Sequence, residues 1–480
     1  MTPWGPQASP SLSSMDRLIN LPVIQSPVDF GPLLDRALDV AEEEEDASLL
    51  DDASLACAVD ALSVGGDGAP LPQNTDGGSP VLHPSPAMSL PVETDEDQPS
   101  QSEGNREGKR MRRRNKRRAE REKRSPWNYQ PKLRVGEKHS TPDVIDVSFG
   151  VEDFPATRNA YVAKAQAIIR ERPLTVQDLK DIGMPIKEWE GKTSHVLRDR
   201  GKFNVGYLLG QPNDEDWPAV VAEANRVFEE ARVEGEGHFT ASEKKTRRGE
   251  FVALVAGVTF CKSKEHPDVR GNLEKQQELI DRLCENPAVA RIAGFGSASM
   301  AYGAPKIYRH YVDHLEPLYE RYGLSTLFGD SIFPSANFNL GPQSASAVHA
   351  DSGNVPYGHC HITALGNFDH KKGGHFVFWD LGFAVEFPPG ASILIPSACV
   401  RHGNTVIQDG EKRYSFTQYC PGSLIQWVRC GFRTAKSLTQ AERDEIDGVG
   451  DARRQKLMNL FSKYDELAAD QQLVFKKGKI

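Results

Sequence analysis

The sequence has few cysteines and no cysteine pair of the kind that binds zinc. Its 480 residues contain seven cysteines, an odd number, and no two of them are spaced as C-x-x-C. We therefore expect neither a zinc ribbon nor a disulfide framework, and a reducing compartment is favoured. The sequence also lacks any run of about eighteen apolar residues, so no membrane span is expected. The opening MTPWGPQASP has no apolar stretch behind a positive start, so no signal peptide is expected either.

Charge is distributed unevenly along the chain. Residues 1–107 hold 20 acidic and 3 basic side chains, a net charge of −17, and are rich in Pro, Ser, Asp and Glu. Such a composition buries too little apolar surface to offset the entropy of ordering, which predicts a disordered acidic region. Residues 125–480 carry a net charge of only −1. A packed core is expected in this nearly neutral part of the chain.

A dense basic run separates these two parts. The stretch GKRMRRRNKRRAEREKR, residues 108–124, has eleven basic and two acidic side chains. Runs of this kind typically contact nucleic-acid phosphates or a nuclear import receptor, although a solvated linker is the alternative. We assign 108–126 as a basic linker, expect DNA or RNA and an import receptor as partners, and predict a nuclear location, with the cytoplasm as the alternative.

Globular composition begins near Trp127, and residues 127–330 are predicted to form a mixed α/β support region. The apolar spacing predicts helices over 216–235, 272–287 and 306–323, and one or two buried strands within GEFVALVAGVTFC (249–261). These helices are expected to form a layer against a sheet.

The sequence pattern of residues 331–435 is typical of a β domain. Short apolar runs broken by Gly, Pro and Asn-Asp turns predict several strands, and a double-sheet jelly roll of the cupin type is the leading architecture. Residues 436–480 return to helical patterns, with TQAE at 439–442 in the form of a capping box. The predicted fold class is α+β: a double-stranded β-helix core with a helical support layer, preceded by the disordered N-terminal region.

The stretch VHADSGN (348–354) places a histidine and a carboxylate two positions apart. In a strand, His349 and Asp351 would point to the same face and could hold one metal ion, whereas a polar edge strand facing water is the alternative. A third ligand is expected from a later strand on the opposite sheet, and His402 in CVRHGN is suitably placed. Two histidines and one carboxylate on one face of an octahedral ion leave three positions open, the arrangement of non-haem Fe(II) oxygenases.

The open positions of such an ion can accept a bidentate 2-oxo acid and then dioxygen. A 2-oxo acid with a second carboxylate needs a cation in the wall, and Arg413 follows His402 after a QDGEK turn, on the next predicted strand. The planar guanidinium binds a carboxylate bidentately. Ser415 is two residues further, on the same strand face, and can donate a second hydrogen bond.

Two longer stretches accompany these residues: FDHKKGGHFVFWDLGFAVEFPPGASILIPSACVRHGN (368–404) and EKRYSFTQYCPG (411–422). Residues 349–419 resemble the double-stranded β-helix core of Fe(II)/2-oxoglutarate-dependent dioxygenases. They are most similar to the TET/JBP-like branch, as found in basidiomycete fungi, and the likeness runs from about Val255 to Thr434. TET enzymes oxidise the methyl group of 5-methylcytosine in DNA, and J-binding proteins hydroxylate thymine.

The resemblance implies roles for particular residues. It assigns iron binding to His349, Asp351 and His402, which would form the catalytic centre, and 2-oxoglutarate binding to Arg413 and Ser415. The implied cofactors are Fe(II), with 2-oxoglutarate and dioxygen as cosubstrates.

Substrate contacts follow the TET pattern less completely. By resemblance, Asn354 contacts the target base and Tyr419 stacks on it after base flipping. Pro421 stands where TET enzymes have a base-contacting histidine, and the TET cysteine-rich zinc-binding region is absent. The predicted function is oxidation of a methyl group on a pyrimidine base in nucleic acid, as in DNA demethylation. The alternatives are a 2-oxoglutarate-dependent hydroxylase of a protein or small molecule, and a non-catalytic cupin-like binding module.

Overall fold

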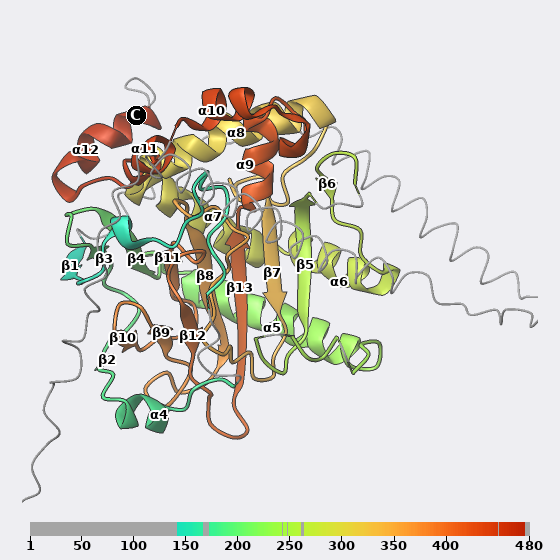
Figure 1. The fold of residues 1–480 in the computed structure, drawn as a ribbon. Helices are drawn as coiled ribbons and strands as arrows, with labels where there is room; N and C mark the ends of the chain where they lie inside the picture. The colour runs from blue at the N-terminus through green and yellow to red at the C-terminus, as the bar shows by residue number, and fades with distance from the viewer. Residues whose placement is uncertain are drawn as a thin grey trace, which may run out of the picture.

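The computed structural model describes residues 142–166, 172–241, 243–246, 248–260, 264–449 and 451–475. The acidic region and the basic run predicted within 1–126 lie outside these residues. The described part has a mixed α/β architecture with one large sheet, one smaller sheet and a layer of helices (Figure 1). No helix in it is both long enough and apolar enough to span a membrane.

The large sheet has nine strands. In spatial order they are β1 (Asp143–Asp146), β3 (His195–Arg198), β4 (Asn204–Gly210), β11 (Ser392–Ile395), β8 (Cys360–Asn367), β13 (Lys412–Tyr419), β7 (Ser335–Asn339), β5 (Ala253–Thr259) and β6 (Asp268–Val269). The stretch 249–261, predicted as one or two strands, thus forms one strand within its described residues. Neighbouring strands pair antiparallel except for β1 with β3.

The smaller sheet has four strands. Their order is β12 (His402–Asn404), β9 (Phe376–Phe378), β10 (Phe383–Val385) and β2 (Ile186–Lys187). Strands β9, β10 and β12 are buried along their whole length. The strands predicted within 331–435 are therefore present and belong to both sheets. Strands β7, β8, β11 and β13 lie in the large sheet, and β9, β10 and β12 lie in the small one.

Four long helices form the helical layer: α5 (Trp217–Glu236), α6 (Glu274–Glu285), α7 (Pro287–Gly303) and α8 (Pro305–Tyr322). Helix α5 packs on the large sheet through Phe228, whose ring lies 6.0 Å from that of Phe338 and 6.1 Å from that of Tyr414. Helix α8 ends at Gly323, whose left-handed backbone (φ 61°) forms the C-cap. The three helices predicted at 216–235, 272–287 and 306–323 are confirmed, with small shifts at their ends.

Helix α7 is absent from the sequence predictions, because its GFGSAS segment has the composition of a loop. Asn286 caps its N-terminus by accepting hydrogen bonds from the backbone of Ala288 and Val289, and Pro287 is its first residue. A side chain at Gly296 would place its Cβ 2.3 Å from the ring of His361 on β8. The glycine therefore allows the helix to approach the sheet closely, and this tertiary contact outweighs the poor helix propensity.

The C-terminal segment packs on the rest of the fold through short helices. These are α9 (Gly422–Arg429), α10 (Gln440–Asp447), α11 (Ala452–Met458) and α12 (Leu467–Asp470). The capping box predicted at 439–442 is confirmed, because Thr439 and Glu442 exchange side-chain to backbone hydrogen bonds. Asp470 forms an ion pair of 3.1 Å with Lys306 of α8, and Gln471 donates to the carbonyl of Tyr302.

Two buried histidines, His361 on β8 and His359 directly before it, are expected to make the stability of the fold depend on pH. Burial lowers the pKa of His361 to about 3 and that of His359 to about 4, both from 6.5. Between pH 6.5 and about 4 the unfolded chain binds protons that the folded chain does not. The free energy of unfolding should therefore fall as the pH falls, by about 1.4 kcal/mol per pH unit for each histidine, and be fully regained above pH 6.5.

We predict that His361→Gln halves the change in the free energy of unfolding per pH unit that the two histidines cause, because only His359 then remains to titrate. Denaturant unfolding at several pH values between 4.5 and 6.5 measures the slope. His238→Gln, at an exposed histidine beyond α5, serves as the control. A slope unchanged by His361→Gln would contradict the assignment.

Candidate active site

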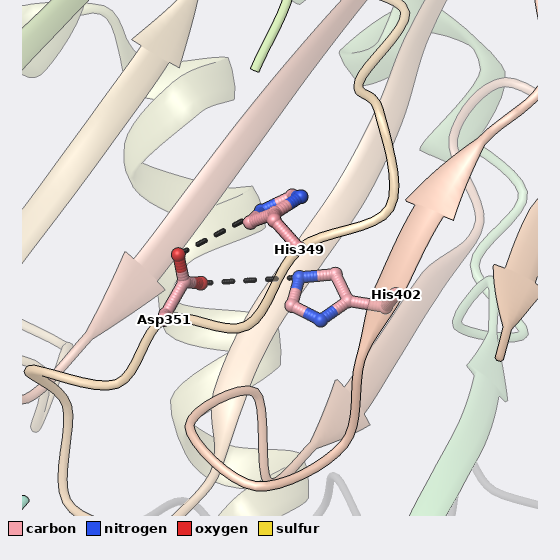
Figure 2. A group of neighbouring side chains, drawn as sticks. All are labelled: His349, Asp351 and His402. Carbon is pink, nitrogen blue, oxygen red and sulfur yellow. Dashed lines mark ion pairs between the residues drawn. The ribbon is translucent and has the colours of Figure 1, made fainter. Parts of the chain in front are cut away.

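Three predicted metal ligands come together between the sheets. The ligand atoms of His349, Asp351 and His402 all lie within 4.8 Å of one another, and among the described residues this is the group of three or more suited to hold a metal ion. The carboxylate of Asp351 is 3.7 Å from Nε2 of His349 and 3.8 Å from Nε2 of His402. Figure 2 shows the carboxylate between the two imidazoles, which converge on it.

The prediction that His349 and Asp351 lie in a regular strand is wrong. They occupy an extended segment between β7 and β8, where His349 forms a single antiparallel bridge with His402. The bridge is closed by two backbone hydrogen bonds of 2.9 and 2.8 Å. His402 lies on the edge strand β12 of the small sheet, and His349 pairs with that edge, so the third ligand does not come from a sheet opposite His349. Residues paired in a bridge present side chains on one face, which brings the two imidazoles together.

Backbone carbonyls orient both imidazoles. Nδ1 of His349 lies 2.8 Å from the carbonyl of Ala347, and Nδ1 of His402 lies 2.9 Å from that of Val400. With each Nδ1–H donating to a carbonyl, each Nε2 presents its lone pair toward the position between the ligands. Burial lowers the pKa of both histidines, which favours the neutral form that binds metals. The donor set thus fits a single Fe(II) ion.

Arg248 is a member of the site that the sequence analysis missed. Its Nη2 donates to the carboxylate of Asp351, and its backbone carbonyl accepts from Ala347 N at 2.7 Å. It lies in the segment between α5 and β5, in a basic and polar sequence that resembles a surface loop. No spacing pattern marks it, because the contact spans 103 positions of sequence. The site therefore contains a cation directly beside its carboxylate.

Arg413 is a buried cation that forms no ion pair with any carboxylate of the described residues. It is only 2% exposed, and burial lowers its pKa to about 10. Its Nη1 donates to the carbonyl of Ser344 at 2.7 Å, while its Nε has no hydrogen-bond partner within the described part of the chain. An unpaired buried guanidinium is costly, so a bound carboxylate would supply both the missing charge and the missing acceptor.

Ser415 shares the face of β13 with Arg413, as predicted. Its Oγ accepts a hydrogen bond of 2.9 Å from Nδ2 of Asn339 on β7, so its own hydroxyl proton remains available to a ligand. The register of the large sheet places Asn339 directly opposite Ser415. The geometry brings the predicted 2-oxoglutarate residues together with a neighbour that the sequence did not indicate.

The two predicted base-contacting residues lie near the end of β13. Tyr419 follows Ser415 on the same strand face, and its hydroxyl lies 3.4 Å from Oδ1 of Asn337. Burial raises the pKa of Tyr419 to about 12, so it remains a neutral hydrogen-bond donor. Asn354 forms a β-bridge with Pro421 and directs its amide toward Cys360 and Ser397.

A basic residue lies further along the same row of the large sheet. Tyr419 pairs with Ser335, Ser335 pairs with Gly257, and the backbone N–H of Arg270 donates to the carbonyl of Gly257 at 2.8 Å. Residues directly opposite one another on neighbouring strands share a face, so Arg270 faces the same side as Tyr419. Gly257 has no side chain between them. Arg270 and Tyr419 therefore lie on the same face of the large sheet.

Other histidines and aspartates of the β region have partners outside this cluster. His361 is directed at α7, and Nε2 of His359 bonds the carbonyl of Val205 at 3.1 Å. Asp380 forms an ion pair with Arg401. The structure thus separates these residues from the cluster of three.

Comparison with known proteins gives only weak likenesses. No family model and no curated protein matches the sequence. Among solved structures, "NgTET1 in complex with 5mC DNA" has 14% sequence identity and a TM-score of 0.37, covering 50% of this chain and 83% of that chain. A 2OG-Fe(II) oxygenase family oxidoreductase from Burkholderia pseudomallei has 19% identity and a TM-score of 0.20, covering 35% and 68%.

A viral collagen prolyl hydroxylase from Paramecium Bursaria Chlorella virus-1, solved with 2OG, has 17% identity and a TM-score of 0.15. The match covers 18% of this chain and 57% of the hydroxylase chain.

Proposed function

We propose that this protein is an Fe(II)/2-oxoglutarate-dependent dioxygenase with a double-stranded β-helix core. Two observations carry the proposal: the ligand atoms of His349, Asp351 and His402 lie within 4.8 Å of one another, and Arg413 is a cation only 2% exposed whose Nε has no hydrogen-bond partner among the described residues. The chemistry that iron supplies in such a site is oxidation of a substrate C–H bond by dioxygen, coupled to conversion of 2-oxoglutarate to succinate and carbon dioxide.

The residues of the chain prepare the site for this chemistry. The two Nε2 atoms and the Asp351 carboxylate would hold the metal, with the imidazoles fixed by their Nδ1 hydrogen bonds. Arg413 would bind the distal carboxylate of 2-oxoglutarate, with Ser415 donating beside it. The buried walls around His402, which stacks on Phe376 at 5.6 Å, exclude water from the reacting groups.

We propose a methylated pyrimidine in nucleic acid as the substrate. Support comes from the resemblance of the His-x-Asp-x-x-Asn and Arg-x-Ser patterns to the TET/JBP-like branch, and from Tyr419 and Asn354 at the same end of β13. Pro421 offers no side-chain donor to a base, which favours the alternative of a protein or small-molecule hydroxylase. A non-catalytic module is the remaining alternative, which the complete set of metal and anion groups disfavours.

Mass spectrometry of nucleosides tests the substrate. The full chain is incubated with Fe(II), 2-oxoglutarate and methylated DNA, and an oxidised 5-methylcytosine or thymine is the expected product. Succinate release without an oxidised nucleoside in DNA or RNA would retain the enzyme class and reject the substrate. Absence of both iron-dependent succinate release and 2-oxoglutarate binding would reject the class as well.

We predict that Tyr419→Ala weakens nucleic-acid substrate binding by about tenfold, because stacking of a base on an aromatic ring is worth roughly 1–3 kcal/mol. Uncoupled turnover of 2-oxoglutarate should be retained, since Tyr419 is not a metal or cosubstrate residue. Steady-state kinetics on methylated DNA would show a raised KM. Tyr464→Ala, in a C-terminal 3-10 turn, is the matched control, and an equal effect of both variants would contradict a base-stacking role.

We also propose that residues 1–124 address the protein to the nucleus and add phosphate contacts. All proposed ligands follow residue 348, and the only dense basic run is at 108–124. Deleting 1–124 should leave 2-oxoglutarate turnover intact, move a tagged protein out of the nucleus and lower the salt dependence of DNA binding, by about 0.9 in log–log slope per lost phosphate contact. Retained nuclear signal with an unchanged salt slope would identify the run as a linker.

A further inference from the structure

A cavity lies among the C-terminal helices, away from the candidate metal centre. Its volume is about 380 Å³. It is formed by α8, the ends of α9 and α10, and α11, which gather at one end of the molecule beyond the sheets (Figure 1). Its lining is His310, His314, Arg429, Glu445, Ile446, Asp447, Gly448, Ala452, Arg453, Lys456, Leu457 and Leu460. The cavity shares no lining residue with the predicted active site.

Two histidines form one wall of this C-terminal cavity. His310 and His314 are one turn apart on α8, and their ring centroids are separated by 4.4 Å. Nδ1 of His314 lies 2.8 Å from the carbonyl of His310. Nε2 of His310 is buried and has no hydrogen-bond partner within the described residues. Buried polar atoms are normally paired, so a ligand in the cavity would supply the missing partner.

Positive charge prevails at this wall. The lining has three cationic side chains, those of Arg429, Arg453 and Lys456, and two carboxylates, those of Glu445 and Asp447. The carboxylate of Asp447 is already engaged by the hydroxyl of Tyr161 at 2.7 Å and by Arg453 at 3.5 Å. Burial lowers the pKa of His310 well below its usual value. His314, Arg453 and Arg429 lower it further, and no carboxylate opposes them among its causes.

Contacts with neighbouring segments hold the guanidinium groups of Arg429 and Arg453 in place. Arg429 donates to the carbonyl of Ile446 at the end of α10. Arg453 donates to the carbonyl of Asn159 and stacks on the ring of Tyr161, 4.0 Å from its centroid. Positioned guanidinium groups lose little entropy when they bind an oxyanion. A metal cation on the His-x-x-x-His pair is disfavoured, because the same two guanidinium groups would repel it.

We propose that the C-terminal cavity binds a phosphate group, either as the free ion or as the monoester of a small metabolite. The cations and the unpaired imidazole supply charge and a hydrogen-bond donor for phosphate oxygens. A volume of about 380 Å³ lies within the range of roughly 300–1,000 Å³ typical of small-molecule sites, and leaves room for more than phosphate alone. The apolar side chains of Ile446, Leu457 and Leu460 would contact the remainder of a monoester. This inference does not depend on the proposed oxygenase activity.

Isothermal titration of the full chain with inorganic phosphate and with glucose 6-phosphate tests the proposal. Saturable binding at one site per chain is expected, and tighter binding of glucose 6-phosphate would identify a monoester as the ligand. Lys456→Gln should weaken the binding about tenfold. The side chain of Lys456 is exposed on α11, so this variant is expected to fold. Lys436→Gln, which removes an exposed lysine outside the cavity, should have no effect.

His310→Gln provides the second variant, since it removes the imidazole and retains a polar group. A loss of affinity similar to that of Lys456→Gln, with an unchanged circular dichroism spectrum, is expected. The proposal is overturned if neither probe binds saturably, or if both variants bind as tightly as the unaltered chain. Displacement of the bound phosphate by 2-oxoglutarate would place it at Arg413 and also overturn the proposal.

Discussion

Replacement of Asp351 or His349 by alanine is expected to reduce 2-oxoglutarate turnover to the background rate while the fold remains intact. The three ligand atoms form a cluster within 4.8 Å that contains no fourth histidine, cysteine or carboxylate among the described residues. A site with three protein ligands has no spare, so losing one removes both affinity and coordination geometry. Asp351→Ala also removes the partner of Arg248, which would place an uncompensated cation beside the two histidines.

Succinate release and iron content measured on the same purified samples check this expectation. His370→Ala is the matched control, because His370 is partly exposed and lies 4.0 Å from Glu386, outside the cluster. Circular dichroism verifies that the variants are folded. If either ligand variant retained iron and released succinate at the rate of the unaltered chain, the assignment of the cluster as the metal centre would be wrong.

Arg413→Lys is expected to raise the KM for 2-oxoglutarate by about tenfold to a hundredfold. Lysine keeps the charge but loses the planar fork, and one charge-assisted hydrogen bond is worth roughly 1.5–3 kcal/mol. The unpaired Nε of Arg413 in its buried position indicates that the guanidinium has capacity left for a ligand. The effect should be largest in KM, because the residue binds the cosubstrate away from the reacting atoms.

Steady-state succinate release at varied 2-oxoglutarate concentration measures the change. Arg291→Lys is the control, since Arg291 lies on α7 and forms ion pairs with Asp214 and Asp216. Equal KM values for Arg413→Lys and the unaltered chain would exclude Arg413 as the cosubstrate anchor. A collapse of the far-ultraviolet spectrum would show instead that Arg413 is needed for folding, and Ser415→Ala then tests the same subsite.

Local patterns in the sequence were enough to find the candidate ligands. His349 and Asp351 are two residues apart, as are Arg413 and Ser415. An extended backbone directs the side chains of such a pair to one face, whether or not the segment is hydrogen-bonded to a neighbouring strand. The prediction of a regular strand for His349 nevertheless fails. The segment is extended but pairs through one bridge only, and hydrogen-bonded pairing depends on a distant partner that local sequence does not reveal.

Longer-range features required the tertiary structure. The contact of Arg248 with Asp351 crosses 103 positions, and nothing in the spacing of a basic loop indicates which guanidinium will face the site. Helix α7 is stabilised by a close approach of Gly296 to His361, so its glycine-rich composition was misleading. In both cases the decisive free energy comes from packing and charge pairing between segments far apart in the chain.

The sequence by itself determined which residues are available for metal and anion binding. It also predicted helices α5, α6 and α8 and the presence of several strands after residue 331. These depend on composition and on periodicities of 3.6 and 2, which are local properties. Only the tertiary structure decided that His349 and His402 meet in one β-bridge, that Arg413 is buried with its Nε unpaired among the described residues, and that His310 lines the C-terminal cavity. Proximity and desolvation arise when distant segments pack together, so no local pattern encodes them.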